Sequence, residues 1–528
     1  MRYSMLLFLA IVGIACAGGN HSAAVTPVAA AAADDLQTQS PDTTIQSFTA
    51  VEGADLMARL EAAQTRARSR QTPYWSAYTF DVRPGIAVDP AIREFHGSMN
   101  TMGDTVVFVG TTSAGVTVET RSLAIFLLRD PASNQITRME VFNLERKREY
   151  SGYPVYWMGR ANNEESLNYL RALAAAAPLD MLSERAVLGI ALHDDARVAG
   201  MLKNFVTSSP NQRIRSSSVY WLGHVGGEST FLATLVRNET EDQKIRRAAA
   251  HAIGRSHDRG MIPTLQSLYD TVKDAEIRRS VINAAGDAVD EQPAWAFLLG
   301  ISRNDADWES RRTAVRQLGD FKRDDAAEEL MKIYNNDTNV EVKRAALRSL
   351  SDTKNPRGQA RLLEIARTET NPELRKSAIR VLSDRGEAAI DDLLKLFDSE
   401  QSAEVRRSIL QTLSDIKSTR VEDKFFEVAK GNDTMEVRRQ AIRLLGERVS
   451  KRSFEFLSTT AQSTDGNAEV QVQAVRAISE QKAEESVPLL IKIARTHPNQ
   501  LVRKQAIRSL GESGDPRAVD FFREVLTK

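Results

Sequence analysis

Apolar residues recur along most of the chain in one ten-residue pattern. A branched apolar residue is followed by one or two basic residues, a small residue, a second branched apolar residue, and then Leu with Gly or Ser. Apolar positions separated by three and four residues predict one face of an amphipathic helix. The starts of the ten copies lie 31 to 33 residues apart, at Ile214–Gly223, Ile245–Gly254, Ile277–Gly286, Ser310–Gly319, Val342–Ser351, Leu374–Ser383, Val405–Ser414, Val437–Gly446, Val470–Ser479 and Val502–Gly511. Ten copies in phase predict an array of structural repeats.

Each repeat has room for a second helix ahead of the pattern. Asp325–Tyr334 and Val487–Ala494 are amphipathic runs of this kind, and the polar residues 335–337 predict a turn between run and pattern. A helix pair of about 32 residues with this motif resembles the HEAT family, in the short form of the bacterial phycobilisome-lyase-like repeats. The resemblance covers residues 150–528. It implies a HEAT-like α-α solenoid in which the second helix of each pair lines the concave surface.

Weaker copies extend the pattern toward the N-terminus. Glu184–His193 is a degenerate copy, and Val155–Gly159 matches Val219–Gly223 closely at a separation of 64 residues, which is two periods. This match places the start of the array near Tyr153. We therefore expect capping and degenerate HEAT units over residues 151–212 and about ten HEAT-like repeats over residues 213–528.

Residues 50–150 have a different composition. Residues 54–68 predict one helix, and the segment 130–134 predicts a hairpin turn. Four segments have the Val, Ile, Thr, Phe and Tyr content of strands: Tyr74–Val82, Thr105–Thr111, Val116–Leu128 and Gln135–Leu144. The predicted fold is therefore mainly α, a solenoid preceded by a small, β-rich α+β domain.

The N-terminus has the pattern of an export signal. Arg2 precedes the apolar run Met5–Ala15, and small residues follow, so residues 1–17 read as a signal peptide. Cleavage after an A-x-A site would start the mature chain near Gly18, whereas lipidation would make Cys16, the sole cysteine, the first mature residue. Both routes remain open. Residues 18–48 are rich in Ala, Thr, Ser, Pro and Gln, which predicts a disordered tether. We expect an exported protein of the periplasm or cell envelope, in contact with a membrane only through such a lipid anchor.

The chain has 70 basic and 70 acidic residues, so its formal net charge is zero, but the basic residues are unevenly placed within the repeats. When the motif is numbered 0 to 9 and wound at about 100° per residue, positions 2 and 6 point away from the apolar stripe. Over the ten copies, fourteen of these twenty positions are basic and none is acidic. We name these fourteen residues the inner basic rows: Arg247, Arg279, Arg312, Arg316, Arg344, Arg348, Lys376, Arg380, Arg407, Arg439, Arg443, Arg476, Lys504 and Arg508.

Two interpretations of the inner basic rows are open. Glu and Asp from turns and adjoining helices, such as Glu404 and Glu436, could neutralise them as a solvated charged face. Alternatively, a protein partner or an acidic polymer binds along the groove through many weak contacts. The Arg or Lys at position 1 lies nearer the core, and we assign it a structural role in an Asp–Arg ladder between repeats, with Asp305, Asp337 and Asp433.

Other candidate sites have weaker support. His193, His224 and His257 lack the spacing of a metal site, and no cofactor, metal or catalytic residue is predicted. Aromatic residues gather near the predicted domain junction, where Tyr156, Trp157, Tyr220 and Trp221 form either packing or a small pocket. The leading functional class is a non-enzymatic envelope scaffold. The alternatives are a HEAT-fold nucleic-acid binder, which export disfavours, and an enzyme like the bilin lyases, which rests on resemblance alone.

Overall fold

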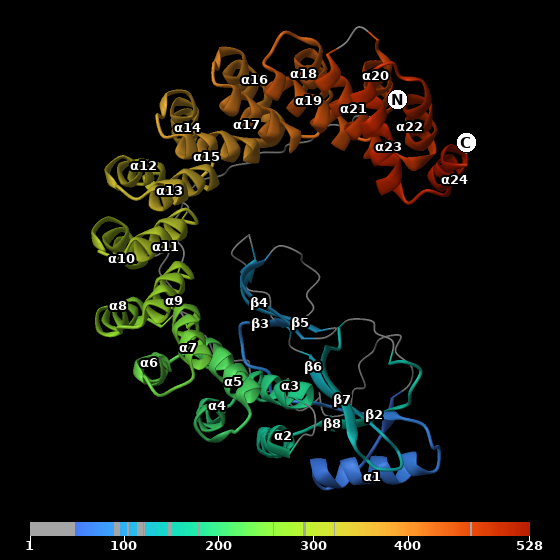
Figure 1. Ribbon diagram of the computed structural model, residues 1–528. Coiled ribbons are helices and arrows are strands. Elements are labelled where there is room, and N and C mark those ends of the chain that lie inside the picture. The colour runs from blue at the N-terminus through green and yellow to red at the C-terminus, as the bar shows by residue number, and fades with distance from the viewer. Residues whose placement is uncertain are drawn as a thin grey trace, which may run out of the picture. The chain divides into compact units, whose positions relative to one another are not determined.

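The computed structural model describes residues 48–88, 95–102, 105–112, 120, 122–145, 150–176, 180–256, 258–288, 292–321, 323–464 and 467–527. They form two compact units, Met1–Asp195 and Ala196–Lys528. The leader, Cys16 and almost all of the predicted tether lie outside the described residues. Figure 1 shows a β-rich N-terminal unit and a second unit made of paired helices. The predicted fold class, a mainly α solenoid after a small β-rich region, is confirmed.

The first unit is built on a mixed sheet of five strands in the order β1-β8-β2-β6-β7. Strand β8 pairs in parallel with β1 and β2, whereas β6 pairs antiparallel with β2 and β7. A second, antiparallel sheet has the order β3-β5-β4. The elements are β1 (Thr49–Ala50), α1 (Leu56–Arg68), β2 (Tyr74–Thr79), β3 (Ile86–Val88), β4 (Phe95–Met102), β5 (Thr105–Thr112), β6 (Leu123–Arg129), β7 (Ile136–Asn143), β8 (Val155–Arg160), α2 (Asn163–Ala176) and α3 (Asp180–Ala191). One face of the larger sheet carries an aromatic core that includes Trp75, Phe126 and Tyr150.

The domain boundary predicted from the sequence, near residue 151, lies N-terminal to the observed one, which follows Asp195. Val155–Gly159, expected to open the repeat array, lies in strand β8 in the interior of the sheet. The degenerate copy Glu184–His193 lies largely in α3, which packs on β7 within the first unit. The predicted capping region 151–212 is therefore divided. Its first part completes the sheet unit, and only the part from residue 196 onward belongs to the helical array.

The second unit consists of helix pairs, and the ten motif copies lie on its odd-numbered helices α5 to α23. Its elements are α4 (Arg197–Ser208), α5 (Gln212–Val225), α6 (Ser229–Arg237), α7 (Gln243–Arg255), α8 (Met261–Thr271), α9 (Ala275–Gly286), α10 (Gln292–Asn304), α11 (Trp308–Leu318), α12 (Ala326–Asn336), α13 (Val340–Asp352), α14 (Pro356–Thr368), α15 (Pro372–Leu382), η2 (Ser383–Ala389), α16 (Ile390–Ser399), α17 (Ala403–Ser414), α18 (Thr419–Lys430), α19 (Met435–Glu447), α20 (Lys451–Gln462), α21 (Ala468–Ser479), α22 (Ala483–Thr496), α23 (Gln500–Ser513) and α24 (Pro516–Leu526). Within this unit, the odd-numbered helices follow the inner side of an arc and the even-numbered helices its outer side (Figure 1).

Local signals explain why the motif helices start in register. A side chain ahead of most of them accepts hydrogen bonds from the first turn, as Asn339 does from the backbone N–H groups of Glu341 and Val342. Such N-caps satisfy orphan backbone donors and define the first helical residue. Position 0 is then fully buried, for example at Val342. A fixed start and a buried position 0 give every motif helix the same rotation about its axis.

The position-1 ladder joins neighbouring repeats as predicted. Ion pairs link Arg278 to Asp305 at 2.8 Å, Arg311 to Asp337 at 2.7 Å and Arg406 to Asp433 at 2.7 Å. Burial acts to raise the pKa of Asp337, but hydrogen bonds from the Arg311 guanidinium and the Asn339 N–H outweigh it and hold this pKa below its usual range. The carboxylate of Asp337 therefore stabilises the folded array in its ionised form.

We predict that Asp337→Asn lowers the free energy of unfolding by about 1.5–3 kcal/mol at neutral pH, the range for hydrogen bonds to charged groups. Because the folded pKa is depressed, the contribution is present above the ordinary carboxyl pKa and is lost as the pH falls through the folded value. Denaturant unfolding of the wild type and the variant should therefore converge in acid. Asp270→Asn, at an exposed carboxylate, is the matched control and should change little. An equal loss in both variants at every pH would contradict the assignment.

Candidate functional site: the inner face of the repeat array

The inner basic rows lie on the motif helices, with position 0 buried beneath them and their side chains exposed or half-buried. Nine of the fourteen are exposed: Arg247, Arg316, Arg348, Arg380, Arg407, Arg439, Arg476, Lys504 and Arg508. The common rotation of the helices brings position 2 of one repeat beside position 2 of the next, and likewise for position 6. The face that results runs the length of the second unit.

Half of the eight basic residues at position 2 are neutralised from within the array. In these four cases, the glutamate just before position 0 pairs with the basic residue at position 2 of the preceding repeat. The pairs are Arg279–Glu309 at 2.6 Å, Arg344–Glu373 at 3.9 Å, Arg439–Glu469 at 3.5 Å and the short pair Lys376–Glu404. The hydrogen bond with Glu404 raises the pKa of Lys376, and the same contact lowers the pKa of Glu404. For these four residues, the interpretation as a solvated, internally paired face explains the charges.

Position 6 differs in the middle of the array. Arg316, Arg348 and Arg380, on α11, α13 and α15, are exposed, and no carboxylate of the described residues lies within 4.0 Å of their guanidinium groups. Farther along, Arg443 pairs with Glu447 on its own helix, and Arg508 pairs with Glu512 at 2.9 Å. Three consecutive repeats therefore present arginines whose charge is available to a partner.

A hollow of about 340 Å³ deepens the inner face between α21 and α23. Its lining includes four members of the inner basic rows, namely Arg439, Arg476, Lys504 and Arg508. One carboxylate, Glu469, and the apolar side chains of Val472 and Leu501 complete this part of the wall. The combination offers several cations around a small apolar patch.

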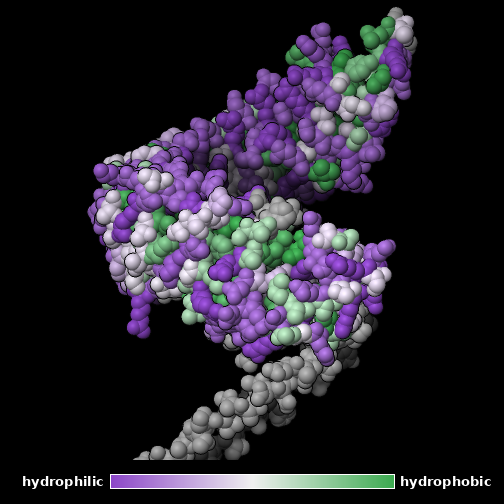
Figure 2. Space-filling model, turned by 90° about the horizontal axis from the view of Figure 1, so that it is seen from below, coloured by the Kyte–Doolittle hydropathy of each residue, from purple (hydrophilic) through white to green (hydrophobic). Residues whose placement is uncertain are grey.

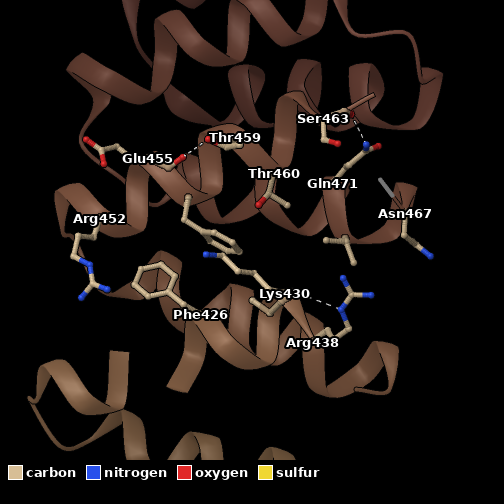
Figure 3. A pocket seen from close by; sticks show the side chains of 13 residues that line it. Phe426, Lys430, Arg438, Arg452, Glu455, Thr459, Thr460, Ser463, Asn467 and Gln471 are labelled. Carbon is tan, nitrogen blue, oxygen red and sulfur yellow. Dashed lines mark hydrogen bonds between the residues drawn. The ribbon is translucent and has the colours of Figure 1, made fainter. Parts of the chain in front are cut away.

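A larger hollow, of about 580 Å³, lies between α18 and α20, away from the inner basic rows (Figure 3). Phe426 and Phe456 meet edge to face at 5.3 Å between ring centroids, and Lys430 lies 5.5 Å from the Phe456 ring. Arg452 already pairs with Asp423 at 2.8 Å, and Arg438 donates a hydrogen bond to the Ala429 carbonyl. This hollow was not predicted from the sequence, because its lining is shared by the four consecutive helices α18 to α21 and follows no single helical face. Two of its cations are engaged by neighbouring groups, so it is less suited to bind an anion than the inner face.

The four aromatic residues of the predicted junction pocket fall into different units. Tyr156 lies buried on β8 against Tyr74, and Trp157 stacks on Phe48 at 5.6 Å between ring centroids. Tyr220 and Trp221 are neighbours on α5. Each pair is held by contacts within its own unit, which fits the packing interpretation, and the pocket stays a prediction.

The histidines are engaged in packing where the structure describes them. His193 stacks on Phe80 at 4.2 Å between ring centroids, and its ring nitrogens contact the Gly189 carbonyl and Ser166 Oγ. Burial lowers the pKa of His193 to about 4, so the ring is neutral at physiological pH. His224 contacts the rings of Tyr220 and Trp221, and His257 lies outside the described residues.

The described part of the chain shows no group of three or more His, Cys, Asp or Glu side chains that could hold a metal ion. Its helices also lack the combination of length and apolar character that crossing a bilayer requires. The face seen in Figure 2 is mostly hydrophilic, with hydrophobic residues in small groups. On the face shown in Figure 2, polar and charged groups are therefore the main chemistry.

Comparisons with known proteins agree with this architecture. A family model described as HEAT repeats matches residues 295–383 and 456–528, so these segments are HEAT repeats. No curated protein matches the sequence. Kap121p has a similar structure over 69% of this chain and 47% of its own, so the match spans less than half of Kap121p, with 12% identity and a TM-score of 0.35. Kap95p, from a structure on its binding to RanGDP, is similar over 69% and 56%, with 10% identity and a TM-score of 0.37. Human deoxyhypusine hydroxylase in complex with glycerol is similar over 54% and 96%, with 15% identity and a TM-score of 0.23.

Proposed function

We propose that this protein with HEAT repeats is a non-enzymatic scaffold of the cell envelope that binds an acidic segment of a partner protein along its inner basic rows. The observation that supports this most directly is the run of Arg316, Arg348 and Arg380, three exposed guanidinium groups on consecutive repeats without a carboxylate of the described chain within 4.0 Å. Like charges on neighbouring helices repel, so a row of this kind is stabilised by an anionic partner. Envelope location is proposed from the apolar leader Met5–Ala15 and from Cys16.

The inner face fits a protein better than the other anionic partners considered. A nucleic-acid groove uses aromatic side chains to stack bases, and the twenty positions of the inner rows include one aromatic residue, Tyr220. The positions that remain polar but uncharged suit a mixed peptide surface. The bilin-lyase alternative has no residue that supports it beyond the resemblance, and an acidic polymer remains the second candidate for the same row.

Charge reversal of the available arginines tests this function. We expect the triple variant Arg316→Glu, Arg348→Glu, Arg380→Glu to bind a glutamate-rich peptide roughly 30-fold more weakly, because three exposed contacts of about 0.7 kcal/mol are lost. Fluorescence anisotropy at low and physiological salt measures the change, which should shrink as salt rises.

The matched control changes three exposed lysines on the outer side by the same total charge. Lys395→Glu, Lys451→Glu and Lys482→Glu should leave peptide affinity within about twofold of the wild type, since these exposed lysines lie on α16, on α20 and directly ahead of α22, on the outer helices. Circular dichroism melting of both triple variants reports whether the array is intact. If the two triple variants weaken binding equally, net charge and not the inner row controls binding, and the proposal fails.

A further inference from the structure

A row of acids lies beside the position-6 arginines. Four residues after position 6, in the last turn of each motif helix from α9 to α23 or one to two residues beyond its end, the chain carries Asp or Glu: Asp287, Asp320, Asp352, Asp384, Asp415, Glu447, Glu480 and Glu512. We name these residues the acidic row. A carboxylate at the C-terminal end of a helix is opposed by the helix macrodipole and its unsatisfied carbonyl groups. Its recurrence in eight successive repeats therefore needs a compensating interaction.

The acidic row is paired internally at some positions and not at others. Glu447 and Glu512 form ion pairs with the arginine four residues earlier on their own helices, and Asp287 lies 3.9 Å from Arg255 of the preceding repeat. Arg476 instead contacts Gln505, and Glu480 forms no ion pair with it. Asp320, Asp352 and Asp384 form no ion pair within 4.0 Å with Arg316, Arg348 and Arg380, or with any other described residue.

All six of these side chains are exposed. Over α11, α13 and α15 and the residues that directly follow them, the inner face therefore carries two neighbouring rows of opposite charge, neither of which forms ion pairs within 4.0 Å in the described part of the chain.

Acidic residues of neighbouring repeats in this segment influence one another's pKa. The pKa of Asp352 is raised, first because the surrounding protein shields it from water and further because Asp384 and Asp320 add like charge, while Arg348 opposes the change. The pKa of Asp320 is raised for the same first reason, with Arg316 opposing. Neither arginine lowers the pKa of its neighbouring acid to the ordinary value, so the two rows do not satisfy each other.

The spacing of the double row is set by the packing of the three helices. Ser349 Oγ on α13 donates to the Val315 carbonyl on α11 at 2.9 Å, and Ser351 Oγ donates to the Val381 carbonyl on α15 at 3.0 Å. Side chain-to-backbone bonds of this kind hold neighbouring helices at close approach, near the usual interaxial distance of about 8–10 Å. Along each helix, the arginine and the aspartate are four residues apart, or about 6 Å.

An extended chain matches this spacing in one conformation. In polyproline II, every third residue points to the same side and advances by about 9.3 Å, close to one helix spacing. A β-strand brings side chains to one edge every 6.6–6.8 Å or so, out of step with the helices. An α-helix has a diameter of about 10–12 Å, which is wider than the separation of about 6 Å between the arginine row and the aspartate row.

We propose that α11, α13 and α15 bind a polyproline-II segment of a partner protein in which every third residue is acidic and faces the arginine row, while an adjacent residue is basic and faces the aspartate row. This rests on the proposed function and adds the charge pattern and the period of the partner. A polyanion such as a nucleic-acid duplex carries one sign of charge and is repelled by the aspartate row. Among acidic segments, the double row therefore favours one in which basic residues accompany the acids over one that carries acids alone.

Two synthetic peptides test the inference. One consists of five repeats of Glu-Lys-Pro and the other of five repeats of Glu-Gln-Pro, so both place Glu at every third residue but only the first carries cations. We expect the full-length protein to bind the Glu-Lys-Pro peptide about tenfold more tightly, because three exposed ion pairs of about 0.5 kcal/mol are gained at the aspartate row. In the triple variant Asp320→Asn, Asp352→Asn, Asp384→Asn, the order should reverse, because the Glu-Gln-Pro peptide then has the larger attraction to the arginines.

The outcomes separate this inference from the function on which it rests. The variant Arg316→Gln, Arg348→Gln, Arg380→Gln should lose affinity for both peptides, and if it keeps both, the proposed function fails. If the wild type prefers the Glu-Gln-Pro peptide while that variant loses both, the basic row binds acids but the aspartate row does not select the partner, and the present inference is overturned. Thermal melting shows that each variant is folded. Repeats of Glu-Lys-Gly, which keep the charges but lack the polyproline-II preference, should bind more weakly than Glu-Lys-Pro; equal binding would overturn the assigned conformation.

Discussion

Gly254→Val is expected to lower the free energy of unfolding of the repeat array by about 3 kcal/mol, the upper end of the usual cost of overpacking. Gly254 is the last motif residue of α7 and lies against α9. A Cβ built at this position would be only 2.9 Å from both the Cα and the carbonyl carbon of Ala284. Because the obstacle is backbone, no side-chain rotation relieves it. The helices must separate, and the core between two repeats loses contact with them.

Gly300→Val is the matched control. Gly300 also lies within a helix, α10, but a Cβ there meets nothing within 4 Å. Both substitutions change helix propensity equally, so the difference between the two variants isolates the steric clash. Denaturant unfolding followed by circular dichroism measures the difference, and hydrogen exchange should show the loss of protection centred on α7 and α9. Equal stability of the two variants would mean that the inner helices do not depend on close backbone contact at position 9.

The sequence was sufficient to predict the array because the same physical requirement repeats. A buried position 0, a small residue at position 9 and a polar cap must recur wherever two neighbouring helices pack in the same way. Val342 is buried and Asn339 caps α13, in the roles that the motif predicts. The strands over 74–79 and 136–143 could also be predicted, because their Val, Ile, Tyr and Phe content distinguishes them from the helical repeats.

The N-terminal boundary could not be found in this way, because nearly the same five residues form a strand in one place and a helix in another. Val155–Gly159 lies in β8 and Val219–Gly223 in α5. Val, Tyr and Trp have high propensities for strands, and Pro154 directly precedes the first segment. In the second, Asn211 caps the helix, and the buried residues Ile214, Ser218 and Leu222 continue its period. Context decided the conformation, and a local match could not reveal it.

For the candidate site, the sequence predicted on which face the side chains of positions 2 and 6 lie, but not which of them form ion pairs. The helical period correctly placed positions 2 and 6 on one face. Whether an arginine is neutralised depends on side-chain distances in the folded array, as the contrast between Arg443, which pairs with Glu447, and Arg348, which has no described carboxylate within 4.0 Å, shows. The acidic row itself was readable in the sequence and was missed, because the motif was numbered only to position 9.

Loss of the buried carboxylate of Glu140 is expected to destabilise the first unit by about 3–5 kcal/mol. Glu140 lies on β7 and is completely buried, and it pairs with Arg185 of α3, whose exposed fraction is 6%. Arg185 Nη1 also donates to the Met139 carbonyl at 3.0 Å, so this guanidinium ties the helix to the strand. In Glu140→Gln, the buried positive charge of Arg185 keeps only neutral partners among these contacts, and the cost of its desolvation is no longer offset.

Two further variants distinguish the buried pair from general disruption of the core. Arg138→Met removes a second partner of Glu140, which contacts it at 2.7 Å but has 41% of its side chain exposed, and should cost about 1 kcal/mol or less. Replacing both charges, by Glu140→Gln with Arg185→Met, should recover much of the stability lost in Glu140→Gln, because no unpaired charge remains buried. Hydrogen exchange in β7 and α3 measures all three variants within the full-length protein. If Glu140→Gln is no more harmful than Arg138→Met, the ion pair does not hold α3 on the sheet, and the close approach of α3 to β7 at Gly189, where an added Cβ would lie 3.0 Å from the Met139 side chain, must provide that attachment instead.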